Sequence, residues 1–385
     1  MTYQNNLCLN CFILSTVCRY AVYLLIIVIA TPKQLAAIYP KEVIESVDDS
    51  GNITEFIGTG PYQFEEWRQD QYIHFSKFDD YVSVSDPADG MPGSKNPHVE
   101  NLYFDIVSDA STRQTGITTE MYDIAMNISL EHYSQVQEDA NLNVDTDERT
   151  YAILNFNKKQ GPLTDEKIRQ AIAAGLDLDS IMYGAFGDED LYSIYSGFMK
   201  QDQQMYSTVG KENYNQKNEE RARELLEEAG YNNEEIVLMA SRDYDYYYQA
   251  ATIILEQLQN IGLNVKLEIY DWPTFLDLEN DPDSWHMEVT GYTTWITPAE
   301  NIIFNEGSPG WTKDPSLDTI ISNIKGAVSD DELQKYYDEL HEILLIDYVA
   351  GIKLGNFKDI YAINNKISNF YTFEGMILWN IGMED

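Results

Sequence analysis

One segment in the second half of the chain constrains the fold most, because its pattern changes from strand to helix and back to strand. The apolar run from Ile236 to Ala240 predicts a strand, and the periodic apolar residues from Tyr246 to Ile261 predict a helix that ends at Gly262. Apolar and polar residues then alternate from Val265 to Ile269, as in a second strand. A strand, a crossover helix and a strand in this order form a right-handed parallel βαβ unit. The segment therefore predicts an α/β fold.

Alternating strand and helix patterns also flank this unit. They predict strands at 152–156, 286–292 and 349–354, and helices at 165–176, 218–229 and 331–347. Before Tyr151 the pattern of predicted elements differs, because a turn at 58–61 leads into β-like segments and a turn-rich loop covers 86–97. The change at Tyr151 predicts a domain boundary, and the length of 385 residues allows about two or three domains.

The charge balance excludes nucleic acid as a partner. The chain has 25 Lys and Arg residues against 64 Asp and Glu residues, which gives a net charge of −39. A field of this sign repels phosphate backbones and anionic lipid headgroups. The apolar fraction of 44% still allows sizeable cores, so we expect a globular protein rather than a disordered one.

Cysteine and histidine give no pattern for a metal or a cofactor. All three cysteines, Cys8, Cys11 and Cys18, lie within the first 18 residues, so the rest of the chain has neither a disulfide framework nor a thiolate metal site. Cys8 and Cys11 form one C-x-x-C without a second pair, which leaves a redox or zinc role only weakly supported. The five histidines are at least 24 residues apart. We therefore predict no cofactor and no metal site.

An apolar run from Ala21 to Ala30 follows Arg19 near the N-terminus. It is too short for a comfortable transmembrane helix, but it fits the apolar region of a secretory signal, with Val28 and Ala30 at suitable cleavage-site positions. A buried strand is the equally weighted alternative. The segment 19–30 is thus a candidate signal or anchor.

Three segments directly follow predicted strands, and they contain polar and aromatic residues. They are 241–244, 270–272 and 292–295. Ligands of open α/β sheets bind beyond the carboxyl ends of parallel strands, so these segments form the candidate ligand site.

Arg242 is the strongest single candidate in these segments. It is the only basic residue between Arg223 and Lys266, and it precedes a predicted helix N-terminus, where anions are favoured. Its planar guanidinium can hold a carboxylate through two hydrogen bonds. The alternative is a structural ion pair with Asp243, Asp245 or another of the abundant acids.

Several motifs resemble those of the family 5 solute-binding proteins of ABC importers, which comprise oligopeptide, dipeptide and nickel types. The motifs are Gly58-Thr-Gly-Pro-Tyr62 followed by Trp67, Asn155-Phe-Asn157, Asp165 to Ala171, Leu176-Asp177, Ala222 to Gly230 and the βαβ block at 236–270. The resemblance runs from about Leu25 to the C-terminus, and these motifs in this order are fairly specific.

The resemblance implies an α/β fold of the two-lobed periplasmic-binding-protein type (type II, cluster C), with mixed sheets and a hinge. Residues 1–150 and 358–385 would form a remnant of lobe I, and residues 151–357 would form lobe II, with hinges near 151–155 and 354–357. Only 57 residues precede Gly58, which implies an N-terminally shortened chain with an incomplete lobe I. The implied protein is extracytoplasmic, monomeric and non-catalytic, and it delivers a peptide or a similar carboxylate-bearing solute to ABC permease subunits.

The resemblance also assigns roles in the site. In dipeptide-binding relatives an arginine at the position of Arg242 pairs with the peptide carboxylate, and a tyrosine lies at the position of Tyr244. Where this chain has Trp295, the relatives place an aspartate for the peptide amino group, so Asp243, Asp271 or another acid takes that role, or the ligand presents no such group. Aromatic side chains would form walls, or they are ordinary core residues. The predicted ligand-binding residues are Ser241, Arg242, Tyr244, Trp272, Tyr292 and Trp295.

Two hypotheses from other classes remain open. A secreted hydrolase is disfavoured, because the chain has no G-x-S-x-G elbow, no H-E-x-x-H motif and no Walker A lysine. A degenerate fragment that folds around lobe II without closing on a ligand is the second alternative, and the short N-terminal part motivates it.

Overall fold

The computed structural model describes residues 39–46, 53, 55–203, 205–294, 303, 306–373 and 375–384. The candidate signal at 19–30, the three cysteines and Trp295 lie outside the described residues. The contacts between its residues divide the chain into two compact units. Unit 1 contains Arg149–Phe357, and unit 2 contains the described residues up to Glu148 together with Lys358 onward. The sequence placed the corresponding boundaries at Tyr151 and Lys358.

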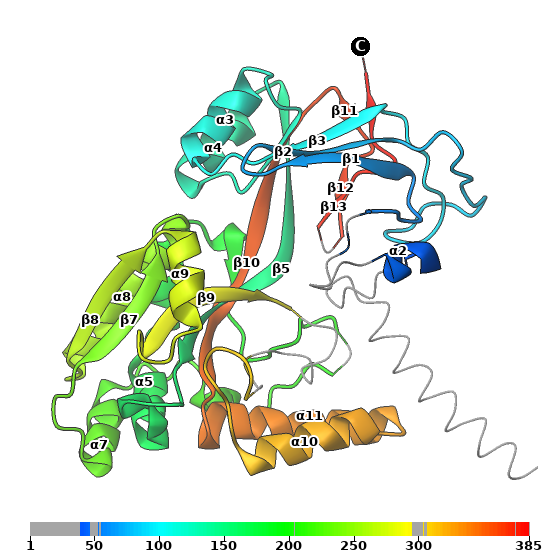
Figure 1. Cartoon of the computed structure of the whole chain (residues 1–385). Coiled ribbons are helices and arrows are strands. Elements are labelled where there is room, and N and C mark those ends of the chain that lie inside the picture. The colour runs from blue at the N-terminus through cyan, green and yellow to red at the C-terminus, as the bar shows by residue number, and fades with distance from the viewer. Residues whose placement is uncertain are drawn as a thin grey trace, which may run out of the picture. The chain divides into compact units, whose positions relative to one another are not determined.

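The sheet of unit 1 is built around the predicted βαβ unit (Figure 1). β7 (Ile236–Ser241) and β8 (Val265–Tyr270) pair in parallel, and α8 (Asp245–Asn260) connects them, which confirms the prediction. β9 (Met287–Thr293) pairs in parallel with β7 on its other side. β5 (Leu142–Phe156) then pairs antiparallel with β9, so the sheet is mixed.

The strand order of this sheet in the described chain is β4-β10-β5-β9-β7-β8, with β6 paired to β10. The remaining members are β6 (Tyr192–Ser193), β10 (Gly351–Asn364) and β4 (Ile124–Met126), which belongs to unit 2 and pairs with the part of β10 in that unit. β5 and β10 are much longer than the strands predicted at 152–156 and 349–354. Both strands run through a boundary between the units. The outer part of β5 is mostly polar and half-buried, which hides it from a search for apolar runs, whereas the outer part of β10 is mostly buried.

Two helices cover opposite faces of the parallel strands. α8 buries Tyr247, Ala250 and Ile254, and a Cβ on Gly291 of β9 would lie 1.9 Å from the Tyr247 hydroxyl, so this close approach requires glycine. α9 (Trp272–Glu279) places Phe275 in a cluster with Met239 and Trp285. Met239 and Gly291 point to opposite faces, because side chains alternate along paired strands.

The helix starts and stops of unit 1 follow local capping signals. α5 (Glu166–Gly175) begins after Asp165, whose side chain accepts the Lys167 N–H at 2.8 Å. α7 (Glu219–Ala229) begins after Asn218 and ends at Gly230, which has a φ of 70°. Both helices match the sequence prediction, and they pack together through the small residues Gly175 and Ala222. The other short elements are α6 (Leu178–Phe186), η1 (Pro162–Thr164), η2 (Glu189–Leu191) and η3 (Lys211–Asn213).

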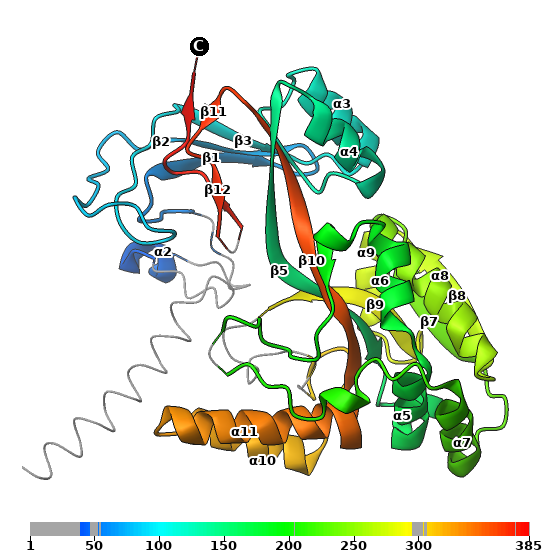
Figure 2. The same ribbon diagram turned by 180° about the vertical axis from the view of Figure 1, so that it is seen from behind.

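α10 (Pro315–Gly326) and α11 (Asp330–Glu342) lie side by side, as both ribbon views show (Figures 1 and 2). The sequence predicted one helix from Asp331 to Asp347. In the structure the α-helix ends at Glu342, and a π-helical turn follows it over Ile343–Asp347. A side chain from α5 binds carbonyls at the end of this π-helical turn. Gln170 donates to the Ile346 and Asp347 carbonyls, so these carbonyls do not need helical partners.

Unit 2 contains an antiparallel sheet in the order β1-β2-β3. Its first two strands correspond to the β-like segments predicted after the turn at 58–61, whereas β3 was not predicted. The predicted loop at 86–97 contains no helix or strand. The elements of this unit are α2 (Lys41–Glu45), β1 (Tyr62–Arg68), β2 (Tyr72–Lys77), β3 (Asn101–Asp105), α3 (Ala110–Thr118), α4 (Leu130–Glu138), β11 (Ile367–Ser368), β12 (Tyr371–Thr372), β13 (Met376–Ile377) and β14 (Gly382–Met383). None of the described helices is long and apolar enough to span a membrane.

Candidate functional site

The carboxyl ends of β7, β8 and β9 lie at one edge of the sheet, because all three strands are parallel. The segments after β7 and β8 are in direct contact there. The Arg242 N–H donates to the Tyr270 carbonyl at 2.9 Å, and an Asp243 carboxylate oxygen accepts the Trp272 N–H at 2.7 Å. The topology therefore joins two of the three segments that the sequence nominated.

The Arg242 guanidinium is open to solvent. Its Nη2 lies 3.8 Å from Oδ2 of Asp271, and the two side chains are 64% and 44% exposed. An ion pair this long and this exposed contributes little to stability. The sequence left an ion pair with Asp243, Asp245 or another acid as the alternative, and the acid that approaches Arg242 is Asp271. Most of the five guanidinium donors face water and can be offered to an anion.

The two acids beside Arg242 also organise the loops. Asp243 fixes the Trp272 N–H, as described above, and Asp271 caps α9 by accepting the Thr274 N–H at 3.0 Å. Hydrogen bonds from Thr274 lower the pKa of Asp271, and the nearby Arg242 charge lowers it further. The edge therefore carries the Arg242 guanidinium together with the Asp243 and Asp271 carboxylates, and backbone N–H groups hold both carboxylates in place.

An aromatic wall stands beside these charges. The Tyr244 and Trp272 rings meet edge to face with centroids 5.0 Å apart, and Trp272 stacks on Phe275 at 5.1 Å. Phe275 is fully buried, and Tyr244 and Trp272 are half-buried. Phe275 was not predicted as part of the site, although its position three residues after Trp272 on a helix places both side chains on one face.

Two predicted residues have surroundings that differ from those of an open ligand contact. Ser241 is 0% exposed, because it is the last paired residue of β7 and is still part of the sheet. Its hydroxyl accepts the Asp243 N–H at 3.2 Å. Tyr292 packs beside Tyr151, with ring centroids 6.2 Å apart, and its hydroxyl is buried. Ser241 therefore shapes the turn, and Tyr292 belongs to the core under α10 and α11. Trp295 lies outside the described residues.

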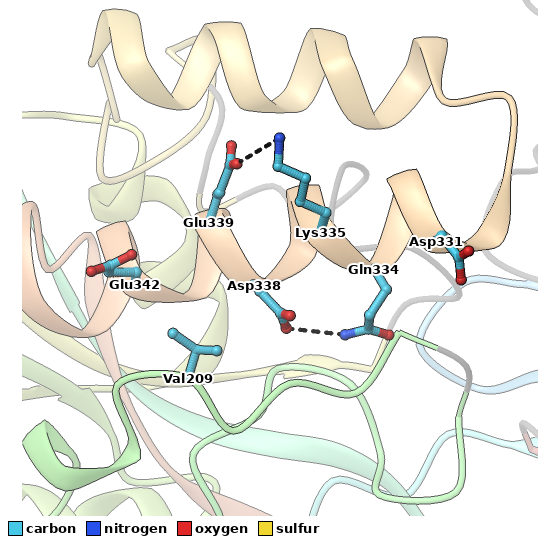
Figure 3. Close-up of a pocket in the computed structure, with 7 residues that line it drawn as sticks. All are labelled: Val209, Asp331, Gln334, Lys335, Asp338, Glu339 and Glu342. Atoms are coloured by element: carbon cyan, nitrogen blue, oxygen red, sulfur yellow. Dashed lines mark hydrogen bonds and ion pairs between the residues drawn. The ribbon is translucent and has the colours of Figure 1, made fainter.

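A hollow lies along α11, and four of the side chains that line it are acidic: Asp331, Asp338, Glu339 and Glu342 (Figure 3). Its groups already engage one another: Lys335 pairs with Glu339 at 3.5 Å, and Gln334 donates to Asp338 at 3.1 Å. The Ser207 hydroxyl also donates to Asp338. Within the described residues, no three His, Cys, Asp or Glu side chains gather in a way that would hold a metal ion. This hollow therefore offers a ligand less than the edge around Arg242.

The fold places this chain among the periplasmic-binding-protein-like α/β proteins. The oligopeptide-binding protein AppA from Bacillus subtilis, solved in complex with a nonapeptide, superposes with a TM-score of 0.75 at 20% identity, covering 90% of this chain and 71% of AppA. The PBP AgaA from A. tumefaciens R10, solved with agropinic acid, also gives a TM-score of 0.75 at 22% identity, covering 90% of this chain and 71% of AgaA.

The sequence comparison gives the family. The chain belongs to the bacterial extracellular solute-binding proteins, family 5 (middle), which match residues 12–314. Over 340 residues it is 24% identical to the oligopeptide-binding protein AppA of Bacillus subtilis (strain 168), which covers 81% of this chain and 60% of AppA. The chain thus spans about three fifths of the length of this relative. The family resemblance inferred from the motifs is confirmed.

Proposed function

We propose that this protein is the extracytoplasmic solute-binding component of an ABC importer. It binds a peptide or a similar carboxylate-bearing small solute without catalysing a reaction, and it works as a monomer that delivers the solute to permease subunits. Membership of an extracellular solute-binding family supports this proposal. So does the similarity to AppA, which is named an oligopeptide-binding protein. The segment 19–30 is the candidate export signal or anchor.

Arg242 carries the proposal, because it is an exposed guanidinium at the carboxyl edge of parallel strands. In this proposal it holds the solute carboxylate through two hydrogen bonds. Tyr244 and Trp272 provide the adjacent apolar wall, and buried Phe275 holds Trp272 in place. Asp271 and Asp243 are the acids positioned to attract a solute amino group.

Three predicted residues remain: Ser241 acts on the turn rather than on the solute, and Tyr292 and Trp295 are kept as proposed contacts. Ser241 positions the turn that carries Arg242, because its hydroxyl accepts the Asp243 N–H. Tyr292 near the end of β9 stays a proposed ligand contact, and so does Trp295, which lies outside the described residues. Unit 2 and unit 1 correspond in this proposal to lobes I and II, with hinges at 151–155 and 354–357 inside β5 and β10.

The test compares thermal stabilisation by peptides with free and with blocked carboxylates. A mixed di- and tripeptide panel should raise the melting temperature of the wild type, because a ligand that binds only the folded state stabilises it. The same peptides with amidated C-termini should have much less effect. Arg242→Ala should lose the response to free carboxylates, while its melting temperature without peptide should stay close to that of the wild type.

Arg221→Ala is the matched control, because Arg221 is also an exposed arginine but lies on α7 with Glu224 and Glu228. It should respond to the peptides as the wild type does. Equal stabilisation of Arg242→Ala and the wild type would remove Arg242 from the site. Turnover of any peptide in the panel would contradict the non-catalytic role.

A further inference from the structure

Glu288 is a glutamate in the interior of unit 1, in the middle of β9. Its side chain is 0% exposed. One carboxyl oxygen accepts a hydrogen bond from Asn155 Nδ2 of β5 at 2.8 Å, and the two residues are directly paired in the sheet. A charged residue in this position is unusual, because strands between two helical layers are normally apolar on both faces.

The second oxygen of Glu288 is buried and has no hydrogen-bond partner in the described part of the chain. The Tyr292 hydroxyl, on the same face of β9, is also buried without such a partner among those residues. A buried polar atom without a partner calls for an explanation. An ionised carboxylate with a single hydrogen bond would be far more costly here than a neutral acid.

Two charged groups face Glu288 from neighbouring elements. Lys158, which follows β5, is the nearby cation, but its ammonium donates to the Phe156 and Ala350 carbonyls, each at 2.7 Å. Glu279, at the end of α9, adds negative charge on the same side. Lys158 is therefore largely occupied by the backbone, and Glu279 opposes a second carboxylate.

The geometry points to Glu288 as a proton-binding site: its carboxyl group is protonated in the folded protein, and the bound proton holds β5, β9 and α9 in their packed arrangement. This inference goes beyond the proposed function and does not depend on any solute. Burial and the Glu279 carboxylate both raise the pKa of Glu288 well above its ordinary value. Burial also raises the pKa of Glu279 to about 7.

The sign of the pH effect follows from these directions. The folded protein keeps the Glu288 proton at pH values where the unfolded chain has released it. Stability from this site is therefore complete below the ordinary glutamate pKa and decreases as pH rises toward the folded value. One such proton changes the unfolding equilibrium constant by about tenfold per pH unit within that range.

The experiment measures urea unfolding between about pH 6 and pH 8 for the wild type and Glu288→Gln, a range above the ordinary glutamate pKa. Glutamine keeps the acceptor for Asn155 and cannot ionise. We expect Glu288→Gln to lose about one proton's worth of the pH dependence, so that its unfolding constant changes about tenfold less per pH unit than that of the wild type. The same measurement on Glu279→Gln should show how much of the pH dependence of the unfolding constant comes from the neighbouring Glu279 carboxyl rather than from Glu288.

Glu256→Gln on α8 is the control, because Glu256 is exposed, and it should keep the wild-type pH dependence. Infrared spectroscopy of the wild type at pH 8 gives a second readout, since a protonated carboxyl has a carbonyl stretch that a carboxylate lacks. This readout stands even if Glu288→Gln does not fold. An unchanged pH dependence in Glu288→Gln, or no protonated carboxyl in the folded wild type at pH 8, would overturn the proposal.

Discussion

Two arginines of unit 1 show how differently the same side chain is used. Arg169 on α5 is 1% exposed and donates hydrogen bonds to backbone carbonyls of Leu163, Thr164, Tyr348 and Val349. Arg242 at the sheet edge is 64% exposed in its side chain and lies 3.8 Å from Asp271 in a long ion pair. The first arginine joins α5 to the segment before β10, and the second exposes its guanidinium to solvent.

A structural arginine can be recognised by donors that the protein itself already uses. Both residues lie in segments that resemble the family, so family membership alone does not distinguish their roles. Arg169 has its donors matched by fixed carbonyls and its guanidinium placed 4.6 Å from the Tyr348 ring centroid. A side chain whose donors are already used inside the protein has nothing left to offer a ligand.

The largest expected effect comes from Arg169→Ala. Several buried carbonyls would lose their donor at once, and each unsatisfied buried group costs about 1 to 3 kcal/mol. We expect the free energy of unfolding to fall by more than about 3 kcal/mol, as measured by urea denaturation. Peptide stabilisation should persist if the variant still folds, because Arg169 does not reach the sheet edge. A loss below about 1 kcal/mol would break the contrast with Arg242.

Arg242→Ala should have a much smaller effect on stability in the same assay. Surface substitutions away from special features usually change the free energy of unfolding by less than about 0.5 kcal/mol. Among the described residues, the substitution removes the exposed ion pair with Asp271, and such a pair contributes little to stability. If this variant is destabilised as much as Arg169→Ala, Arg242 is a structural residue.

The smallest expected effect is that of Asp271→Asn, which sharpens the account of the edge. Asparagine keeps the helix cap at α9 but removes the negative charge beside Arg242. The affinity for a peptide with a free carboxylate and a blocked amino group should increase by a factor of about two to five at low salt. Calorimetric titration measures it, and high salt should reduce the difference. A decreased affinity would indicate that Asp271 itself contacts the solute.

Much of unit 1 was predictable because its signals are local. The βαβ unit around Ile236–Ser241 and the helices α5 and α7 follow from apolar periodicity and from caps such as Asp165 and Gly230. The outer part of β5 was not predictable in this way, because its mostly polar, half-buried residues form a strand only through long-range pairing. The outer part of β10 is mostly buried, but it also pairs with a segment far away in the chain, β4.

The candidate site also has a part that local sequence signals predicted and a part that they did not. Parallel strand order alone put Arg242 and Trp272 at one edge, so the sequence found the neighbourhood. It did not distinguish Ser241, which is buried, from Arg242, which is exposed one residue later. It also gave no sign that Asp271 would be the acid near the guanidinium.

Local sequence patterns were enough to establish the class of fold, the family motifs and the sheet edge that we propose as the solute site, because each depends on residues close together in the chain. Which charged side chains are exposed and which are enclosed became clear only from the folded chain. Arg169 and Glu288 are ordinary charged residues in the sequence, and they become interior groups because segments far apart in the chain pack around them. Burial is a property of the assembled elements, so no local pattern contains it.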